Sequence, residues 1–587
     1  MSPTSDSATG NDGLPLTLGV APRLPVVHSG AARALFLLSA ATTIAILWWA
    51  HDLGSTDARH QLTPIFLMLF ILPDQYAAMG LLLILVVAAL VSREDGFGRP
   101  LTWIGTHPRS IAAAAAAVLC AGTLLIYRNH PFAMDEYAAF FQSQVFSAGR
   151  LAGQFPPELL DWLVPRWFQN YFLIVSPQSG AVASAYWPAF SLLLAPFTWL
   201  RIPWACNPVI SACTLLVIHR LALEMLGDRQ AAGFAVLATL ASPVFFADGI
   251  SYYAMPAHLL ANGLYALLLL RPEPRRVFLA GLIGSVALTL HNPVPHMLFC
   301  VPWLFWVVRR ERGERLLLWL CLGYTPLCAL LGVGWALYCG HLAQAGGVSG
   351  VHAGVAAALQ RYGAAFALPD SAVLLARLVG LAKVWLWAVP GLVVLAIAGA
   401  WRRWGDTRFR LLVISALLTL IGYLFVPVDQ GHGWGYRYFH SAWLALPLLA
   451  AAALAPAADS LATPGRASLF ANLPTRTFAV ACALLTLVFG VGQRAWQIHQ
   501  LIALDLAQLP ASAGPQPQVV FLDVRLMFYG ADLVQNEPFL REHVIRMLSH
   551  GADADAALMK AHFPRYHRAA VERNATVWIA DAAVATR

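Results

Sequence analysis

Long apolar runs, separated by short stretches that carry arginine, dominate the pattern of hydrophobic and polar positions along the chain. Because a helix that crosses a bilayer needs about 20 apolar residues, this pattern predicts an all-α polytopic membrane protein with about 13 spans. The predicted spans are 32–50, 76–92, 110–127, 203–224, 230–247, 254–270, 276–291, 294–308, 316–338, 377–400, 411–427, 438–456 and 476–493. Residues 61–75 are expected to form a re-entrant or tilted prefix to the second span.

The basic residues between spans predict how the chain is threaded. Short loops rich in Lys and Arg stay in the cytoplasm. On the expected threading these clusters face one side: Arg93–Arg109, His219–Arg229, Arg271–Arg276, Arg309–Arg312, Arg402–Arg410 and Arg466–Arg476. The threading requires that Ala181–Leu200 does not cross the membrane. Pro188 and Pro196 interrupt that stretch, which favours a re-entrant or interfacial helix pair.

Three regions follow from this threading. Residues 1–30 are predicted to be a disordered cytoplasmic N-terminus, and 31–493 a transmembrane module with a periplasmic loop at 128–202. Residues 494–587 are predicted to be a small α/β periplasmic domain. Its expected strands and helices are Val519–Val524, Thr576–Ala580, Phe539–His550 and Ala556–Ala561.

Composition supports this class. Hydrophobic residues make up 59% of the 587 residues and charged ones only 12%, against roughly a quarter in soluble proteins. The net charge of +8 lies in short clusters between apolar runs, so we expect membrane lipids as partners and no nucleic acid. The eight cysteines lie in or at the ends of apolar runs and form no metal-binding pattern, which is typical of packing residues. The expected location is a bacterial inner membrane.

An acidic pair, Asp135-Glu136, opens an amphipathic stretch directly after the third predicted span. Residues 136–151 place Tyr137 on an apolar face and Ser143 on the opposite one, which predicts a helix in the membrane interface. A carboxylate held there is a candidate general base toward a lipid-borne substrate, with its basicity raised by the low-dielectric boundary. The alternative is that Asp135 only caps the helix.

A second polar cluster lies between two predicted spans, at residues 428–440. It contains His432, Tyr436, Arg437 and His440 among three glycines and several aromatic residues. An arginine on the periplasmic side runs against the usual bias, which makes Arg437 the candidate ligand of a lipid phosphate. The alternative is an interfacial aromatic belt with an anchoring arginine.

Further candidates lie near the periplasmic ends of other spans. Histidine is costly inside a bilayer, so His258 and His291 are expected to line a wet cavity, with packing between helices as the alternative. Tyr186 and Trp187 crowd the first loop and are candidate sugar or acceptor contacts, together with Tyr137. No metal site is predicted, and the open alternative is a divalent cation held by the acidic pair with His130.

At these residues the chain resembles the integral-membrane glycosyltransferases of the C-type fold (GT-C), in the branch of lipid A aminoarabinose transferases and protein O-mannosyltransferases. The resemblance rests on Met134-Asp135-Glu136-Tyr137 through Ala148-Gly149-Arg150-Leu151, on Ala185-Tyr186-Trp187-Pro188, on Asn207 through His219-Arg220-Leu221-Ala222, and on Ala241-Ser242-Pro243. It covers roughly Ser110–Val308 and is architectural rather than motif-exact. The chain departs from the family by an added hairpin of two spans and by its C-terminal region.

The resemblance implies a specific chemistry. Such enzymes move a sugar from a polyprenyl-phosphate carrier to an acceptor at the outer membrane face. Asp135 would be the general base and Glu136 its fallback, while a loop at 340–350 would order over the carrier. The acceptor is left open between a glycan, a lipid and a protein. The competing classes are a transporter or flippase, an O-antigen ligase or polymerase, and a non-catalytic scaffold.

Overall fold

The computed structural model describes residues 29–55, 65–92, 97–344, 367–427, 430–456, 469–511 and 514–581. The predicted disordered tail, up to residue 28, lies outside these residues. So does the greater part of the glycine-rich loop that was expected to cover a carrier lipid, from residue 345 onward.

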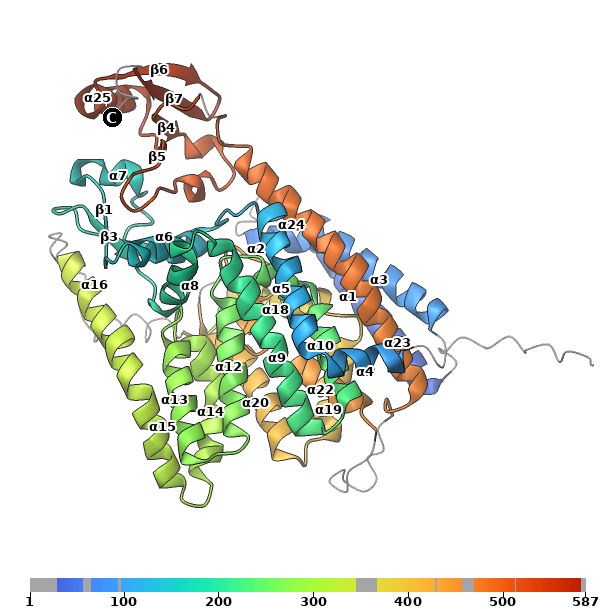
Figure 1. The fold of residues 1–587 in the computed structure, drawn as a ribbon. Coiled ribbons are helices and arrows are strands. Elements are labelled where there is room, and N and C mark those ends of the chain that lie inside the picture. Colours follow the sequence, from blue (N-terminus) through green and yellow to red (C-terminus); the bar gives the residue numbers. More distant parts are fainter. Residues whose placement is uncertain are drawn as a thin grey trace, which may run out of the picture.

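The chain builds a tall bundle of apolar helices with a small sheet above one end (Figure 1). Its helices before the first loop are α1 Gly30–Ser55, α2 Ile65–Ile71, α3 Pro73–Val91, α4 Gly98–Thr106 and α5 Pro108–Leu125. Those after it are α9 Cys206–Leu226, α10 Arg229–Leu240, α11 Pro243–Gly249, α12 Met255–Leu269, α13 Pro274–Leu288, α14 Val294–Val308, α15 Gly313–Leu327, α16 Trp335–Gln344, α18 Ser371–Leu386, α19 Leu392–Arg402, α20 Thr407–Gly422, α21 Arg437–His440, α22 Ala445–Leu454, α23 Leu473–Leu485 and α24 Val491–Leu506. We call this bundle the membrane module.

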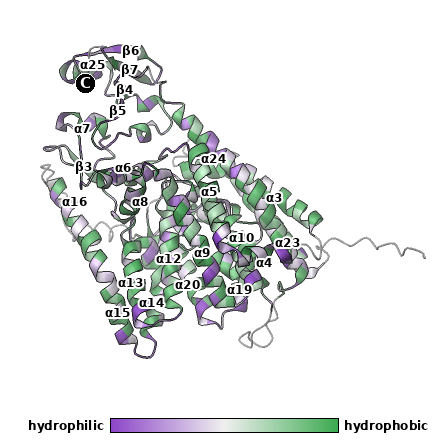
Figure 2. Ribbon diagram, viewed as in Figure 1, coloured by the Kyte–Doolittle hydropathy of each residue, from purple (hydrophilic) through white to green (hydrophobic). Residues whose placement is uncertain are grey.

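The chain is a multi-pass membrane protein. Within the described residues, seven helices are long and apolar enough to cross a bilayer, or eight if α10 and α11 form one span bent by 63°. Figure 2 shows apolar residues along the bundle and polar residues at its end loops. The predicted count of 13 is not confirmed, because several predicted spans are short or broken helices. The stretch 377–400, for example, is divided between α18 and α19 at Trp387–Gly391.

Small residues allow close contact between the helices α13 and α15. A Cβ added to Gly281 of α13 would lie 2.3 Å from the carbonyl oxygen of Leu320 in α15, and one added to Gly323 would lie 2.2 Å from that of Phe278. Only glycine permits this approach of two backbones, which is a common device where membrane helices pack. The contact keeps α13, α14 and α15 together at the outer edge of the module.

The first loop holds the predicted helix, but this helix does not have the predicted exposed polar face. Its helix, α6 Met134–Ser147, is buried on nearly all sides, and Ser143, expected to face away, is buried against the Phe140 carbonyl and Thr198. The loop also holds β1 Gly153–Gln154, α7 Leu160–Leu163, β2 Leu173–Val175, β3 Ala181–Ser184 and α8 Ala189–Trp199, with antiparallel strand order β1-β3-β2. The expected helix pair at 181–200 is therefore a strand followed by one helix, because Ala181–Ser184 pairs with two neighbours.

Residues 514–581, here called the C-terminal cap, contain a four-stranded sheet of order β5-β4-β7-β6. Its elements are β4 Gln518–Leu522, β5 Val544–Leu548, α25 Ala552–His562, β6 Tyr566–Val571 and β7 Ala575–Ala580. The prediction of a helix at 539–550 was wrong, because Val544–Leu548 instead pairs in parallel with the wholly buried β4. The strands near Val519–Val524 and Thr576–Ala580 and the helix near Ala556–Ala561 are confirmed.

The cap packs on the first loop and shares a hydrophobic core with it. Tyr137 and Phe141 of α6 belong to the same buried cluster as Phe521 and Met547 of the cap. The Tyr137 hydroxyl donates a hydrogen bond to the Asn536 carbonyl at 2.6 Å. This shared core holds the cap over the start of α6.

Candidate functional site

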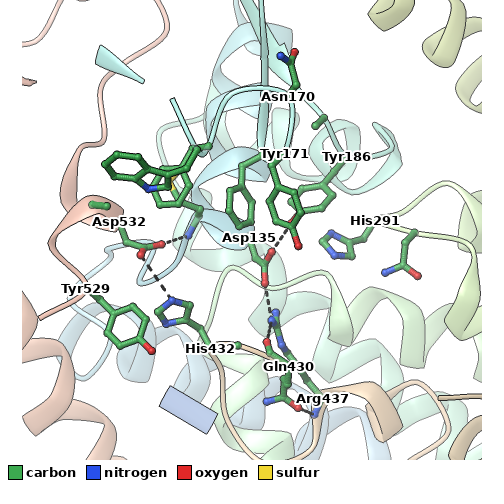
Figure 3. A pocket seen from close by; sticks show the side chains of 18 of the residues that line it. Asp135, Asn170, Tyr171, Tyr186, His291, Gln430, His432, Arg437, Tyr529 and Asp532 are labelled. Carbon is green, nitrogen blue, oxygen red and sulfur yellow. Dashed lines mark hydrogen bonds and ion pairs between the residues drawn. The ribbon is translucent and has the colours of Figure 1, made fainter. Parts of the chain in front are cut away.

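A cavity of about 860 Å³ lies where α6, the segment 430–438 and the cap meet (Figure 3). It is lined by Met134, Asp135, Trp167, Phe168, Asn170, Tyr171, Phe172, Ala185, Tyr186, Met255, His291, Asn292, Tyr423, Gln430, Gly431, His432, Arg437, Tyr438, Val524, Met527, Tyr529, Gly530, Ala531 and Asp532. Aromatic walls with a few convergent charged groups are typical of a ligand site.

Asp135 lies at the centre of this cavity, in the first turn of α6 (Figure 3). Its Oδ2 accepts a hydrogen bond from Arg437 at 2.6 Å, and its Oδ1 accepts one from the Tyr186 hydroxyl. Burial alone would raise the pKa of Asp135, but Arg437, His291 and Tyr186 together lower it to about 2. The expected rise in basicity was therefore wrong for the protein without ligand.

Arg437 is held in place by backbone geometry. The loop before it has positive φ at Gly431, Gly433 and Gly435, which only glycine adopts without strain. Gln430 accepts hydrogen bonds from the Arg437 backbone N–H, at 2.9 Å, and from its guanidinium.

One donor of Arg437 is left over. Its Nε is buried and has no hydrogen-bond partner among the described residues. The guanidinium lies 4.5 Å from the centre of the Tyr253 ring. Burial lowers the pKa of Arg437, but the negative charge of Asp135 more than offsets this effect, so the net shift is upward and the group remains cationic. Arg437 lines the cavity, and a planar cation there suits an anionic group such as a phosphate.

Glu136 points away from the cavity, although it is the next residue. It accepts hydrogen bonds from the backbone N–H of Phe132 at 2.8 Å and of Tyr252 at 2.7 Å, and from the Tyr127 hydroxyl at 3.0 Å. The side chain is fully buried, which raises its pKa to about 8 against these hydrogen bonds. Its contacts tie the start of α6 to the loop before α12.

Of the other predicted site residues, Tyr186, His291 and His432 line the cavity with Asp135 and Arg437. The rings of Tyr186 and His291 lie 4.0 Å apart. Burial lowers the pKa of both His291 and His432 to about 4, so both imidazoles are neutral near pH 7. A neutral imidazole can accept or donate a hydrogen bond to a bound sugar.

The remaining predicted contacts lie behind the cavity wall. His258 is fully buried in α12, and His440 lies with its Nδ1 2.8 Å from Asp248 Oδ2. Tyr436 packs against Gly380, and Tyr137 is engaged with the cap. The Trp187 backbone N–H faces the His291 carbonyl at 3.5 Å, so this residue lies next to the wall rather than in it.

No pattern in the sequence pointed to the residues that the cap contributes. Asp532 Oδ1 accepts a hydrogen bond from the Met134 backbone N–H at 2.8 Å, and its Oδ2 lies 3.7 Å from His432 Nε2. Burial raises the pKa of Asp532 to about 7. The Tyr529 ring lies 4.5 Å from that of His432. The cap is thus part of the site.

A metal site was left open by the sequence. Within the described ranges, no group of three or more His, Cys, Asp or Glu side chains is arranged to hold an ion. Asp135 and Glu136 do not converge, because Glu136 is occupied by backbone donors away from the cavity. The divalent-cation alternative stays a prediction.

No protein-family model matches the chain, and neither does any curated protein. Among solved structures, it is similar to ArnT from Cupriavidus metallidurans bound to undecaprenyl phosphate, with 12% identity, 81% of this chain and 99% of that chain covered, and a TM-score of 0.48. The apo structure of the same protein is 12% identical, with 81% of this chain and 98% of that chain covered and a TM-score of 0.47. Arabinosyltransferase EmbB from Mycobacterium smegmatis is 15% identical, with 66% of this chain and 34% of that chain covered and a TM-score of 0.36.

These structures are glycosyltransferases of the C-type fold, the family that the sequence resembles. With identities of 12–15% and TM-scores below 0.5, they assign no activity, donor or acceptor to this chain. Its function has to be argued from its own cavity.

Proposed function

We propose that the chain is a membrane glycosyltransferase, which moves a sugar from a polyprenyl-phosphate carrier to an acceptor hydroxyl at the periplasmic face. The observation that carries this proposal is the Asp135–Arg437 pair at the wall of an 860 Å³ cavity in a membrane protein. Such a reaction needs a carboxylate near the acceptor and a cation near the leaving phosphate. The pair supplies both within one site.

The first step is donor binding. The carrier phosphate approaches the Arg437 guanidinium from the cavity and competes with Asp135 for its hydrogen bonds. Because Arg437 is what holds the pKa of Asp135 near 2, this exchange raises the pKa of the carboxylate and makes it a better base. Donor binding thereby activates the base.

The transfer step then follows. Asp135 takes the proton of the acceptor hydroxyl as that oxygen attacks the anomeric carbon, and the bond from this carbon to the phosphate oxygen breaks. Arg437 stabilises the negative charge that the phosphate gains. Tyr186 and His291 stand beside Asp135 and position the sugar or acceptor by hydrogen bonds. The products are the glycosylated acceptor, the carrier phosphate and a proton on Asp135.

The experiment measures binding of the carrier alone, because the acceptor is not identified. Purified protein in detergent is titrated with a polyprenyl phosphate without sugar, and retention is measured by native mass spectrometry. We expect Arg437→Ala to weaken retention at least tenfold. Arg166→Ala is the matched control, because Arg166 is an exposed arginine of the first loop that also pairs with an aspartate, Asp161, but at the surface.

Equal retention by the wild-type protein and Arg437→Ala would remove the carrier site from this cavity. Retention without any sugar transfer from glycosylated carriers would favour the flippase alternative. Transfer of a long glycan in one step would favour the ligase or polymerase alternative.

A further inference from the structure

A second cavity, of about 670 Å³, lies between α14 and α20. The helix ends that form it are opposite to those at the site above, because α14 begins next to Asn292 and α20 ends next to Tyr423, both in the first cavity. The 15 residues of α14 place the two cavities about 20 Å apart. This second cavity is here called the basic groove, and it lies at the ends of α14 and α20 that are remote from the first cavity.

The basic groove has a charged end and an apolar wall. Arg309 and Arg310 follow α14, and Arg410 comes from the first turn of α20. The wall continues along both helices with Val301, Phe305, Leu411, Ile414 and Leu418. The size lies within the range of roughly 300–1,000 Å³ that is usual for ligand sites.

Two of the three arginines contact side chains of their own helical segments, although Arg309 and Arg310 are exposed. The Arg310 guanidinium lies 4.3 Å from the centre of the Trp306 ring, and Arg410 donates to the Thr407 hydroxyl at 3.2 Å. Below them, Trp303 donates to Ser415 at 3.2 Å, and Ser415 donates to the Phe299 carbonyl at 2.8 Å. These contacts fix α14 against α20, so the shape of the groove is determined by the fold.

The charge of the groove is not balanced by the protein. In the part of the chain that the structure describes, no acidic side chain forms an ion pair with Arg309, Arg310 or Arg410. The nearest acid in sequence to Arg410, Asp406, is paired with Arg408 at 2.6 Å. Three cations at the end of an apolar channel on a membrane helix therefore lack an anion.

From these observations we infer that the basic groove binds one anionic phospholipid. Its phosphate lies among Arg309, Arg310 and Arg410, and an acyl chain follows the wall formed by Phe305 and Ile414. Pockets of this kind, basic at the membrane surface and apolar below, suit lipids with a net negative head group. The distance from Asp135 makes this lipid separate from the sugar carrier.

The test uses the full chain, purified and reconstituted in nanodiscs that contain phosphatidylglycerol and phosphatidylcholine. After extraction into detergent, native mass spectrometry counts the retained lipid. We expect one phosphatidylglycerol per chain in the wild type. The double variant Arg309→Gln/Arg410→Gln should retain it about 30-fold more weakly, because each arginine near a membrane surface contributes roughly fivefold to the affinity.

Two further variants keep the inference falsifiable. Arg275→Gln/Arg315→Gln removes two exposed arginines from the same end of the module but outside the groove, and it should retain the lipid. Ile414→Trp fills the groove without a change in charge and should lose the lipid.

Three results would overturn the inference. They are equal retention by both double variants, equal retention of phosphatidylcholine, and preferential retention of a polyprenyl phosphate.

Discussion

Two buried aspartate–cation clusters in this molecule have similar chemistry but different surroundings. In the membrane module, Asp74 accepts from Lys383 at 2.9 Å and from Arg494 at 2.5 Å, and all three side chains are at most 2% exposed. In the cavity, Asp135 pairs with Arg437 at 2.6 Å, and the Asp135 side chain is 16% exposed. The first cluster is enclosed, while the second faces open space.

The hydrogen bonds of the two clusters differ in the same way. Asp74 also accepts from the Trp387 indole at 3.0 Å, and Arg494 lies 4.0 Å from the centre of the Trp387 ring. Arg437 instead keeps a buried Nε without a partner among the described residues. A cluster whose groups are all satisfied joins helices, here α3, α18 and α24. One whose two charged groups line a cavity can exchange its ion pair for a ligand.

The largest expected effect distinguishes the two clusters by activity. Asp135→Asn keeps the size of the side chain and its hydrogen bond with Tyr186, but it removes the base. We expect sugar transfer to fall by about 10²–10⁴ while the melting temperature stays close to the parental value. Transfer at the parental rate would mean that Asp135 is not the base.

The reverse pattern is expected at the enclosed cluster. Asp74→Asn leaves Lys383 and Arg494 buried without an anion, which should cost about 3–5 kcal/mol of stability. Thermal unfolding in detergent measures the loss, and the turnover of the protein that remains folded should be close to normal. A stable but inactive Asp74→Asn variant would contradict the assignment of the Asp74 cluster to stability and of the Asp135–Arg437 pair to activity.

A smaller effect is expected from Arg437→Lys. Lysine keeps the charge but not the planar fork that can hold a phosphate and Asp135 together. We expect roughly 10–100-fold weaker carrier binding, since a charge-assisted hydrogen bond contributes about 1.5–3 kcal/mol. Arg166→Lys, at the surface of the first loop, serves as the control, and equal binding by both variants would reduce Arg437 to an anchor.

The smallest expected effect is a shift in the pH dependence. Arg437 lowers the pKa of Asp135 to about 2, so the free protein has the base ionised at any pH well above that value. The profile of kcat/KM, which reports the free protein, should therefore lose activity only at very low pH. Donor binding withdraws Arg437 and raises this pKa. As the pH is lowered, kcat should therefore begin to fall at a higher pH than kcat/KM does. Coincident acid limbs would argue against the exchange of ion pairs.

Part of this site was predictable from the sequence, because two local signals pointed to it independently. Asp135 stood out at the start of a helix after an apolar run, and Arg437 as an arginine against the charge bias. The chain brings them into contact across 302 positions. Neither signal predicted that contact or the low pKa that it produces.

The rest depends on packing that local patterns do not encode. Asp532 reaches the cavity only because the cap shares its core with α6, and its own neighbours in sequence are unremarkable. The break between α18 and α19 did have a signal, Pro390-Gly391, but the apolar run on either side outweighed it. The strand Val544–Leu548 was mistaken for a helix because its parallel partner lies more than 20 positions away.

The long helix that leads to the cap has a geometric consequence. Leu473–Leu506 is one apolar helical run of 34 residues, and it rises about 50 Å along its axis. The run is longer than the roughly 30 Å of a hydrocarbon core, and Figure 1 shows it lying obliquely across the bundle. The cap is thus joined to the membrane module by one continuous helical run, which ends beside the site. On the function proposed above, the acceptor would have to enter between the cap and the module.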